Sequence, residues 1–258
     1  MSRFSSMSVI LVFGLLTAAC NTAPARLSLQ ALPQANVHAL DEGQTLLDAT
    51  QAGNVNQVRT LLARNVALNS VDPQGNTALM RAARDGHSEI TALLLERTVH
   101  VWTQNRKGLN ALMIASVKGH ANIVRQLINN GANINARTPQ GDTALILASL
   151  FDKPDVSKIL LEHGALVNLR ESNGITALMI AADGGYEPIV KQLLEYGANV
   201  HAATSGGESA LVLAKEKGFR AIIDMLERAG AVEPLGYRPS QEITRRDPST
   251  GPQRQYKS

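Results

Sequence analysis

The sequence predicts an all-α solenoid of about six repeats, each of 33 residues, in which helix–turn–helix units are joined by β-hairpin-like turns. Three observations predict this fold class. Short segments that begin with a glycine recur at one fixed spacing, at Gly75, Gly108, Gly141, Gly174 and Gly207. Columns of leucine and alanine keep the same spacing. Aromatic residues make up only 3 % of the chain, so aliphatic side chains must form the core, as they do in stacked helical units.

Composition and charge exclude several classes of protein. Hydrophobic residues are 44 % and charged residues 18 % of the 258 residues, which is typical of a globular chain. The net charge of +3 is too small to indicate a nucleic-acid partner or electrostatic attachment to an anionic membrane. Cys20 is the only cysteine, which excludes a disulfide within the chain and a metal site built from cysteines.

The first element, residues 1–19, is predicted to be an export signal. Arg3 precedes an apolar run from Val9 to Leu16, and the small residues Ala18 and Ala19 follow it. This order of a basic start, a short apolar stretch and a small-residue exit is typical of a signal peptide. The run is shorter than the roughly 20 apolar residues that a membrane-spanning helix needs.

The segment that ends at Cys20 resembles the lipobox of bacterial lipoproteins, in which the cysteine thiol is lipidated and becomes the first residue of the mature chain. Thr17 departs from the leucine that is usual there. The resemblance implies a membrane anchor with acyl chains such as palmitate at Cys20, because several acyl chains together anchor a protein firmly. It also implies a cell-envelope protein that faces the periplasm. Asn21 favours the outer membrane over the inner one. A plain signal cleaved after Ala19 is the alternative.

Two flanking segments are predicted to lie outside the core. Residues 20–38 hold the lipidated cysteine and a linker that contains Pro24 and Pro33. Residues 233–258 contain four prolines and many polar residues, and cannot bury enough apolar surface to order themselves. We expect this C-terminal tail to be disordered.

Between these segments, residues 39–232 are predicted to form repeats 1 to 6, with boundaries near 39–71, 72–104, 105–137, 138–170, 171–203 and 204–232. In repeat 3, residues 110–118 have helical spacing and Gly119 ends that helix. A second amphipathic helix follows over residues 120–128, and Gly131 caps it. Such a pair cannot bury its own apolar face, so each repeat must pack on the next.

The repeats closely resemble the ankyrin repeat. The match rests on Gly108, Ala111-Leu112-Met113, Ala115, Gly119-His120, Ile123-Val124, Leu127-Ile128, Gly131-Ala132 and Asn135-Ala136, with equivalents in the other copies. The family's proline is alanine throughout, and its histidine is Met, Ile or Val, so the family's Thr–His bonds are absent and apolar packing replaces them. The resemblance implies a non-enzymatic module that binds a protein partner, with no cofactor, small-molecule substrate or nucleic acid.

No catalytic or metal-binding motif is recognisable in the sequence. His87 and His120 each follow a glycine at the start of an outer helix. By resemblance to the family, they are structural and bond the backbone at the turn between helices. Asp183-Gly184-Gly185 falls at the same kind of turn and is interpreted as scaffold.

In the ankyrin family, partners contact the turn tips and the inner helices on the concave side. Carried over by register, this predicts the partner-binding residues Arg84, Arg106, Lys107, Leu109, Lys118, Gln140, Asp142, Leu150, Phe151, Asn173 and Ile175. Basic residues on or beside this side, which also include Arg81, Arg137 and Arg170, favour either an acidic partner or an ordinary solvated face. Phe151 is either a binding anchor or a ring folded against its neighbour, and Trp102 is expected to fold against its neighbour.

Three functional hypotheses follow. The first is a membrane-anchored module that binds a periplasmic or envelope protein. The second is an immunity or inhibitor protein that neutralises a toxin or an enzyme in the periplasm. The third is an accessory factor for periplasmic oxidative-stress defence.

Overall fold

The computed structural model describes residues 34–64 and 66–233, with side chains described from residue 42 onward. The predicted signal peptide, Cys20, most of the predicted linker and the C-terminal tail lie outside the described residues. The described part contains helices and tight turns, without extended strands, as expected for an all-α solenoid.

Twelve helices occur in the described residues. They are α1 (Gln34–Gln51), α2 (Val55–Ala63), α3 (Ala78–Asp85), α4 (Ser88–Leu95), α5 (Ala111–Lys118), α6 (Ala121–Asn129), α7 (Ala144–Leu150), α8 (Pro154–Glu162), α9 (Ala177–Gly184), α10 (Glu187–Glu195), α11 (Ala210–Lys217) and α12 (Arg220–Arg228). Each predicted repeat therefore holds two helices. α1 begins at Gln34, five residues before the predicted start of repeat 1 at residue 39.

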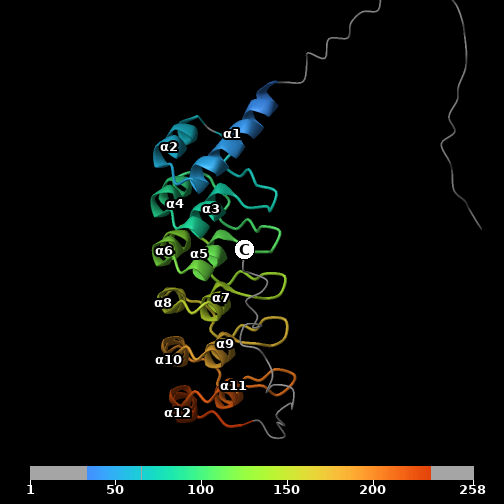
Figure 1. Ribbon diagram of the computed structural model, residues 1–258, viewed down its shortest axis with the longest axis vertical. Coiled ribbons are helices and arrows are strands. Elements are labelled where there is room, and N and C mark those ends of the chain that lie inside the picture. Colours follow the sequence, from blue (N-terminus) through green and yellow to red (C-terminus); the bar gives the residue numbers. More distant parts are fainter. Residues whose placement is uncertain (1–33, 65, 234–258) are drawn as a thin grey trace, which may run out of the picture. The chain divides into compact units, whose positions relative to one another are not determined.

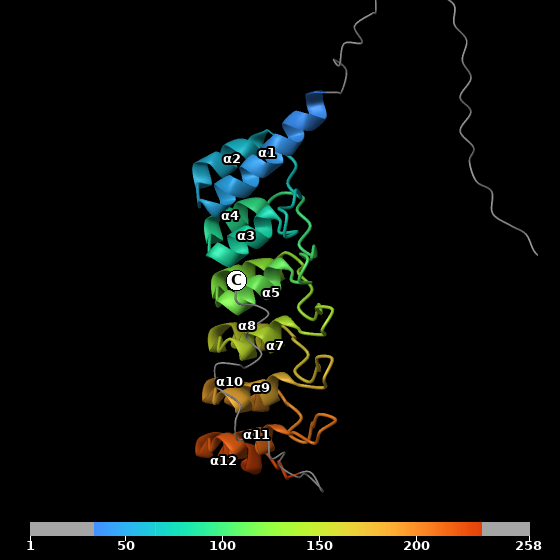
Figure 2. The ribbon, with the colours of Figure 1, turned by 45° about the vertical axis from the view of Figure 1, so that its right-hand side comes forward.

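The helices form two rows. Successive odd-numbered helices from α3 to α11 pack on one another, and so do successive even-numbered helices from α2 to α12. Figures 1 and 2 show the two rows side by side, with the turns that join the repeats projecting beyond the odd-numbered row. The core lies between the rows and is aliphatic, with Leu112, Ile123 and Leu127 among its fully buried residues. The odd-numbered helices are therefore the inner helices beside the turns.

A hydroxyl or amide side chain begins each inner helix from repeat 2 to repeat 6. Thr77 accepts a hydrogen bond from the main-chain nitrogen of Met80, and the equivalent residues Asn110, Thr143, Thr176 and Ser209 do the same. Such an N-cap contributes about 1 kcal/mol to a helix. The polar residue of this column thus keeps a hydrogen-bonded role, although the family's histidine is missing.

A second polar column holds each turn in shape. Asp72 accepts hydrogen bonds from the main-chain nitrogens of Gln74 and Asn76. In repeats 3 to 6, main-chain nitrogens of the turn donate in the same way to the side-chain oxygens of the residues that replace Asp72, namely Asn105, Thr138, Glu171 and Thr204. Because each turn is tied at its base, its tip is presented at a fixed place beside the inner helix.

Side-chain bonds to the backbone connect consecutive repeats. The guanidinium groups of Arg137 and Arg170 donate to the carbonyl oxygens of Arg170 and Ala203, in each case 33 residues further along. On a parallel line, the amide oxygen of Asn135 accepts from the nitrogen of Leu166, and Asn168 accepts from Asn199. We call these bonds rungs. They fix the spacing of the turns.

Candidate functional site

A groove of about 440 Å³ lies between the turns of repeats 2 and 3. Two turns and two inner helices contribute its lining residues, which are Pro73, Gln74, Asn76, Arg84, Asn105, Arg106, Lys107, Leu109, Ile114, Val117 and Lys118. Its volume falls within the range of roughly 300–1,000 Å³ that is usual for ligand pockets. These eleven residues are called the groove below.

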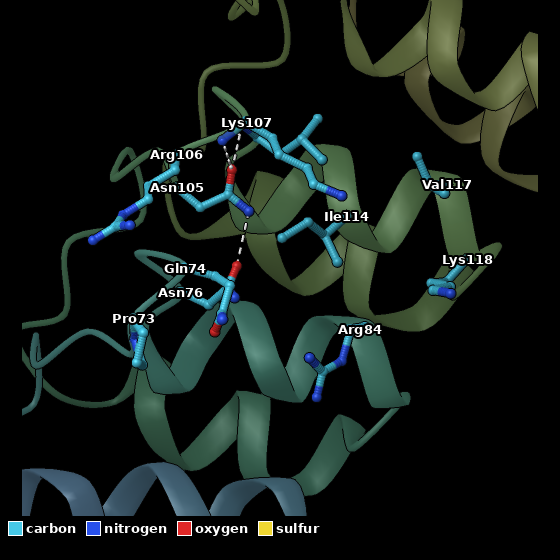
Figure 3. Close-up of a pocket in the computed structure, with 11 residues that line it drawn as sticks. Pro73, Gln74, Asn76, Arg84, Asn105, Arg106, Lys107, Ile114, Val117 and Lys118 are labelled. Atoms are coloured by element: carbon cyan, nitrogen blue, oxygen red, sulfur yellow. Dashed lines mark hydrogen bonds between the residues drawn. The ribbon is translucent and has the colours of Figure 1, made fainter. Parts of the chain in front are cut away.

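The two turns are bonded to each other beside the groove. The main-chain nitrogen of Arg106 donates to the carbonyl oxygen of Gln74 over 3.0 Å. The side-chain amide of Asn105 donates to that of Asn76 over 2.8 Å, and Figure 3 shows this bond at the centre of the site. The groove therefore has walls whose separation is set by hydrogen bonds.

The floor of the groove is aliphatic and its rim is basic. Ile114 and Val117 lie on α5, and Leu109 lies at the base of the turn of repeat 3. In Figure 3, the Lys107 side chain runs over Ile114, while the Arg106 side chain runs away from it. Arg84 and Lys118 lie at the far ends of α3 and α5. None of the eleven lining residues carries a carboxylate.

Arg84 is already engaged by a neighbour. Its guanidinium donates two hydrogen bonds to the carboxylate of Asp85, over 2.9 and 2.8 Å. This pairing raises the pKa of Arg84 above its ordinary value. The same hydrogen bonds lower the pKa of Asp85, against the opposing effect of partial burial, and the charge of Lys118 adds to the lowering. Arg84 thus stays protonated and is partly neutralised at the edge of the groove.

Five of the predicted partner-binding residues meet in the groove, namely Arg84, Arg106, Lys107, Leu109 and Lys118. Asn105 and Ile114 also line the groove but were not among the predicted partner-binding residues. Ile114 could have been found from the sequence, because it lies 33 residues after Arg81, at the same position of its repeat. Asn105 could have been found in the same way, because it lies 33 residues after Asp72 and so occupies the same position in its turn.

The other predicted residues lie elsewhere. Gln140 and Asn173 are exposed in the turns of repeats 4 and 5. Leu150 is only 9 % exposed and Asp142 is buried, where its carboxylate accepts from the Thr138 hydroxyl. Ile175 packs against the core, and Phe151 is half-buried at the end of α7. The expectation that Leu150 forms an exposed end of an inner helix is therefore wrong, because α7 is fully buried up to its last residue.

Three of the basic residues expected near the concave side belong to the framework. Arg81 is 8 % exposed and donates to the Asp72 carboxylate at 3.2 and 3.1 Å. It also donates to the side chain of Gln51. Burial would raise the pKa of Asp72, but the bonds from Asn76, Arg81 and Gln74 outweigh it and lower this pKa. Arg137 and Arg170 form the rungs described above.

Trp102 folds against a neighbouring ring, as expected, although the residue stays 67 % exposed. It stacks on the ring of His100, with centroids 5.1 Å apart and an interplanar angle of 17°. Trp102 occupies the register of Asn69, Asn135 and Asn168, so the junction between repeats 2 and 3 has no asparagine rung.

The two histidines after glycines bond the backbone, as the resemblance implied. Nε2 of His120 lies 3.2 Å from the carbonyl oxygen of Arg84, and Nε2 of His87 lies 3.5 Å from that of Gln51. Both carbonyls belong to the preceding repeat. A Cβ on Gly86, whose φ is 80°, would come within 2.8 Å of the His120 ring, so glycine is needed there for two reasons.

The described residues hold no cluster of three or more His, Cys, Asp and Glu side chains suited to a metal ion. Within the same ranges, no helix is both long enough and apolar enough to cross a membrane.

The comparison with known families agrees with this architecture. A family pattern described as ankyrin repeats in three copies matches residues 15–105, 99–171 and 166–232, which together span well over half of the chain. No match was found among curated proteins. Ankyrin repeats are in general non-enzymatic modules for protein–protein interaction. The paired helices, the tied turns and this match together show that the chain belongs to the ankyrin-repeat family.

Proposed function

We propose that this chain is a membrane-anchored interaction module, without enzymatic activity, that binds a periplasmic or envelope protein in the groove between repeats 2 and 3. One observation carries the proposal. The groove combines an aliphatic floor, three amide side chains and a basic rim on tied turns, so it offers a preorganised surface to a polypeptide. Membership of the ankyrin-repeat family supports the same conclusion.

The anchor is supported by the sequence alone. Cys20 is the only cysteine, and it stands at the one position in a lipobox-like segment where lipidation needs it. Anchoring at that point would hold the repeats at the membrane surface, facing the periplasm, with the outer membrane favoured by Asn21. This arrangement would restrict the partner to proteins of the envelope.

A photo-crosslinking experiment tests the binding site. A photoreactive amino acid at Gln74, which is exposed on the groove wall, should form a covalent adduct with a partner in intact cells. The matched position is Asn122, which is exposed on the outer helix α6. Adducts from Gln74 that are missing from Asn122 would support the groove. Equal adducts from both positions, or none from Gln74, would contradict it.

The anchor has an independent test. Cells fed a clickable palmitate analogue should label the wild-type chain, and the Cys20→Ser variant should lose the label and leave the membrane fraction. Retention of Cys20→Ser in the membrane fraction would contradict anchoring through this residue. The result does not depend on the groove.

A further inference from the structure

We infer that the occupant of the groove is an acidic stretch of polypeptide that places an aliphatic side chain on Ile114, between the basic groups of Lys107 and Lys118. This inference rests on the proposed function, because it names the chemistry of the partner at the same site. It commits to a polypeptide. A free inorganic anion is an outcome that the test below separates.

Charge complementarity is the first argument. Arg84, Arg106, Lys107 and Lys118 are basic and no lining residue is acidic, although the adjacent Asp85 partly neutralises Arg84. Such an arrangement attracts carboxylates and repels basic segments, and it raises the rate at which an acidic partner arrives. The net charge of the whole chain is only +3, so this concentration of positive charge is local to repeats 2 and 3.

The floor gives the second argument. Ile114 is 8 % exposed and lies between the Lys107 side chain and the end of α3 in Figure 3, while the partly buried Val117 lies further along α5. Ile114 takes the place of Arg81, so the step from repeat 2 to repeat 3 exchanges a buried guanidinium for a largely buried aliphatic side chain, whose small exposed part lines the groove. A small anion gains nothing from that surface, whereas a leucine or isoleucine side chain flanked by carboxylates can use both the floor and the rim.

The walls give the third argument. The side chain of Gln74 is exposed, and Asn76 and Asn105 lie across the middle of the groove. Asn76 and Asn105 already bond each other and their own turns, so the exposed amide of Gln74 is the group on the wall that can donate to and accept from a peptide main chain. A strand-like segment fits these three features together.

The Arg84–Asp85 pair adds a regulatory detail. Asp85 neutralises Arg84 through two hydrogen bonds, and its carboxylate competes with any carboxylate that an incoming segment offers. Replacing Asp85 with asparagine would therefore release a cation at the groove. The change removes the ion pair with Arg84, but Asp85 is the last residue of α3, where a negative charge is unfavourable for the helix dipole, so the net loss of stability should be small.

The experiment is a selection of random twelve-residue peptides displayed on phage, with the full chain immobilised in detergent. We expect the enriched peptides to carry Asp or Glu on both sides of a Leu or Ile. The best peptide should weaken roughly threefold to tenfold with the Lys107→Gln/Lys118→Gln variant and tighten roughly twofold to fivefold with Asp85→Asn. Its affinity should fall as salt rises. The matched control, Arg125→Gln/Lys158→Gln, removes the same charge from exposed positions on outer helices and should bind like the wild type.

Four results would overturn the inference. The first is enrichment of neutral or basic peptides, and the second is the absence of any peptide whose binding depends on Lys107 and Lys118. The third is an equal loss of affinity with the control variant. The fourth is full competition by inorganic polyphosphate, together with unchanged binding after the Leu or Ile of the peptide is replaced by serine. The last would identify an anion site. Adducts from Gln74 in cells, combined with any of these results, would leave the groove as the partner site and reject only its acidic occupant.

Discussion

The junction between repeats 2 and 3 differs from the junction between repeats 4 and 5. Both are bonded at the turn tips, through the nitrogen of Arg106 and the nitrogen of Ser172. Repeats 4 and 5 also share an arginine rung from Arg170 and an asparagine rung from Asn168. Repeats 2 and 3 keep only the rung from the amide of Gln104 to the carbonyl oxygen of Arg137.

The difference shows that the position of a basic residue within its 33-residue repeat determines whether it bonds the next repeat or lines the groove. Arg170 sits at the base of a turn and bonds the next repeat, whereas Arg106 sits at a turn tip beside a groove. The junction with the groove is also the one that has exchanged an asparagine rung for an exposed tryptophan. Departures from local rules are expected at binding sites, because such sites are selected for more than stability.

The largest expected effect concerns Arg81, the buried arginine of repeat 2. Arg81→Ile alone should lower the free energy of unfolding by about 3 kcal/mol, because it leaves the buried carboxylate of Asp72 without its guanidinium partner. The double variant Asp72→Asn/Arg81→Ile recreates the pair found in repeat 3, Asn105 and Ile114, and should recover most of the loss. Urea unfolding followed by circular dichroism measures both. A double variant as unstable as the single one would break the comparison between the two repeats.

A pH dependence is expected from the same carboxylate. The pKa of Asp72 is lowered in the folded chain, so its contribution to stability is present above its ordinary value of 3.8 and is lost as the pH falls through the folded value. The midpoint of thermal unfolding should therefore drop steeply below about pH 4. Asp72→Asn should show a flatter profile in that range, while the other carboxylates, Asp85 among them, keep part of the slope. Identical profiles for the two proteins would contradict this assignment.

A smaller effect separates framework arginines from groove arginines. Arg170→Ala should cost about 1 kcal/mol of stability, because it removes a charged hydrogen bond to the carbonyl oxygen of Ala203. Arg106→Ala should change stability by less than about 0.5 kcal/mol, since its side chain is exposed at a turn tip. Chemical denaturation of the two variants side by side measures the contrast. Equal losses would remove the distinction drawn here.

The smallest effect is a gain. Trp102→Asn restores the asparagine register and should stabilise the chain by roughly 0.5–1 kcal/mol, because the new amide can accept from the nitrogen of Asn133 as Asn135 does from Leu166. Trp102→Ala removes the indole without restoring the rung and serves as the control. Thermal melts by circular dichroism distinguish the two. A destabilised Trp102→Asn variant would show that the stack on His100 outweighs a rung.

The fold could be predicted because its determinants repeat. Residues that recur every 33 positions, such as Leu112, Ala115 and Leu127, indicate both the length of the repeat and the buried face of each helix. All three are buried in the structure. Asp152 stands where other repeats have glycine, and it is the sole non-glycine residue with positive φ in the described ranges, at 50°. Local chemistry and register were sufficient for these features.

The site could be predicted only in part. Register placed five residues in the groove, but it could not show that Arg137 and Arg170 reach carbonyl oxygens 33 residues away, since that depends on how closely the repeats stack. It also misjudged Leu150. Side-chain direction at a helix end depends on where that helix stops, and α7 stops one residue earlier, relative to the repeat, than α5 and α9 do.

The exposed stack of Trp102 on His100 has a practical consequence for spectroscopy. Trp102 is the only tryptophan, so the indole emission of the entire chain originates from one junction. Its ring is already largely in water, and global denaturation should therefore leave the emission wavelength almost unchanged. The intensity should instead follow the separation of the indole from the His100 ring, which makes this junction observable by tryptophan emission, to which the remaining repeats contribute nothing.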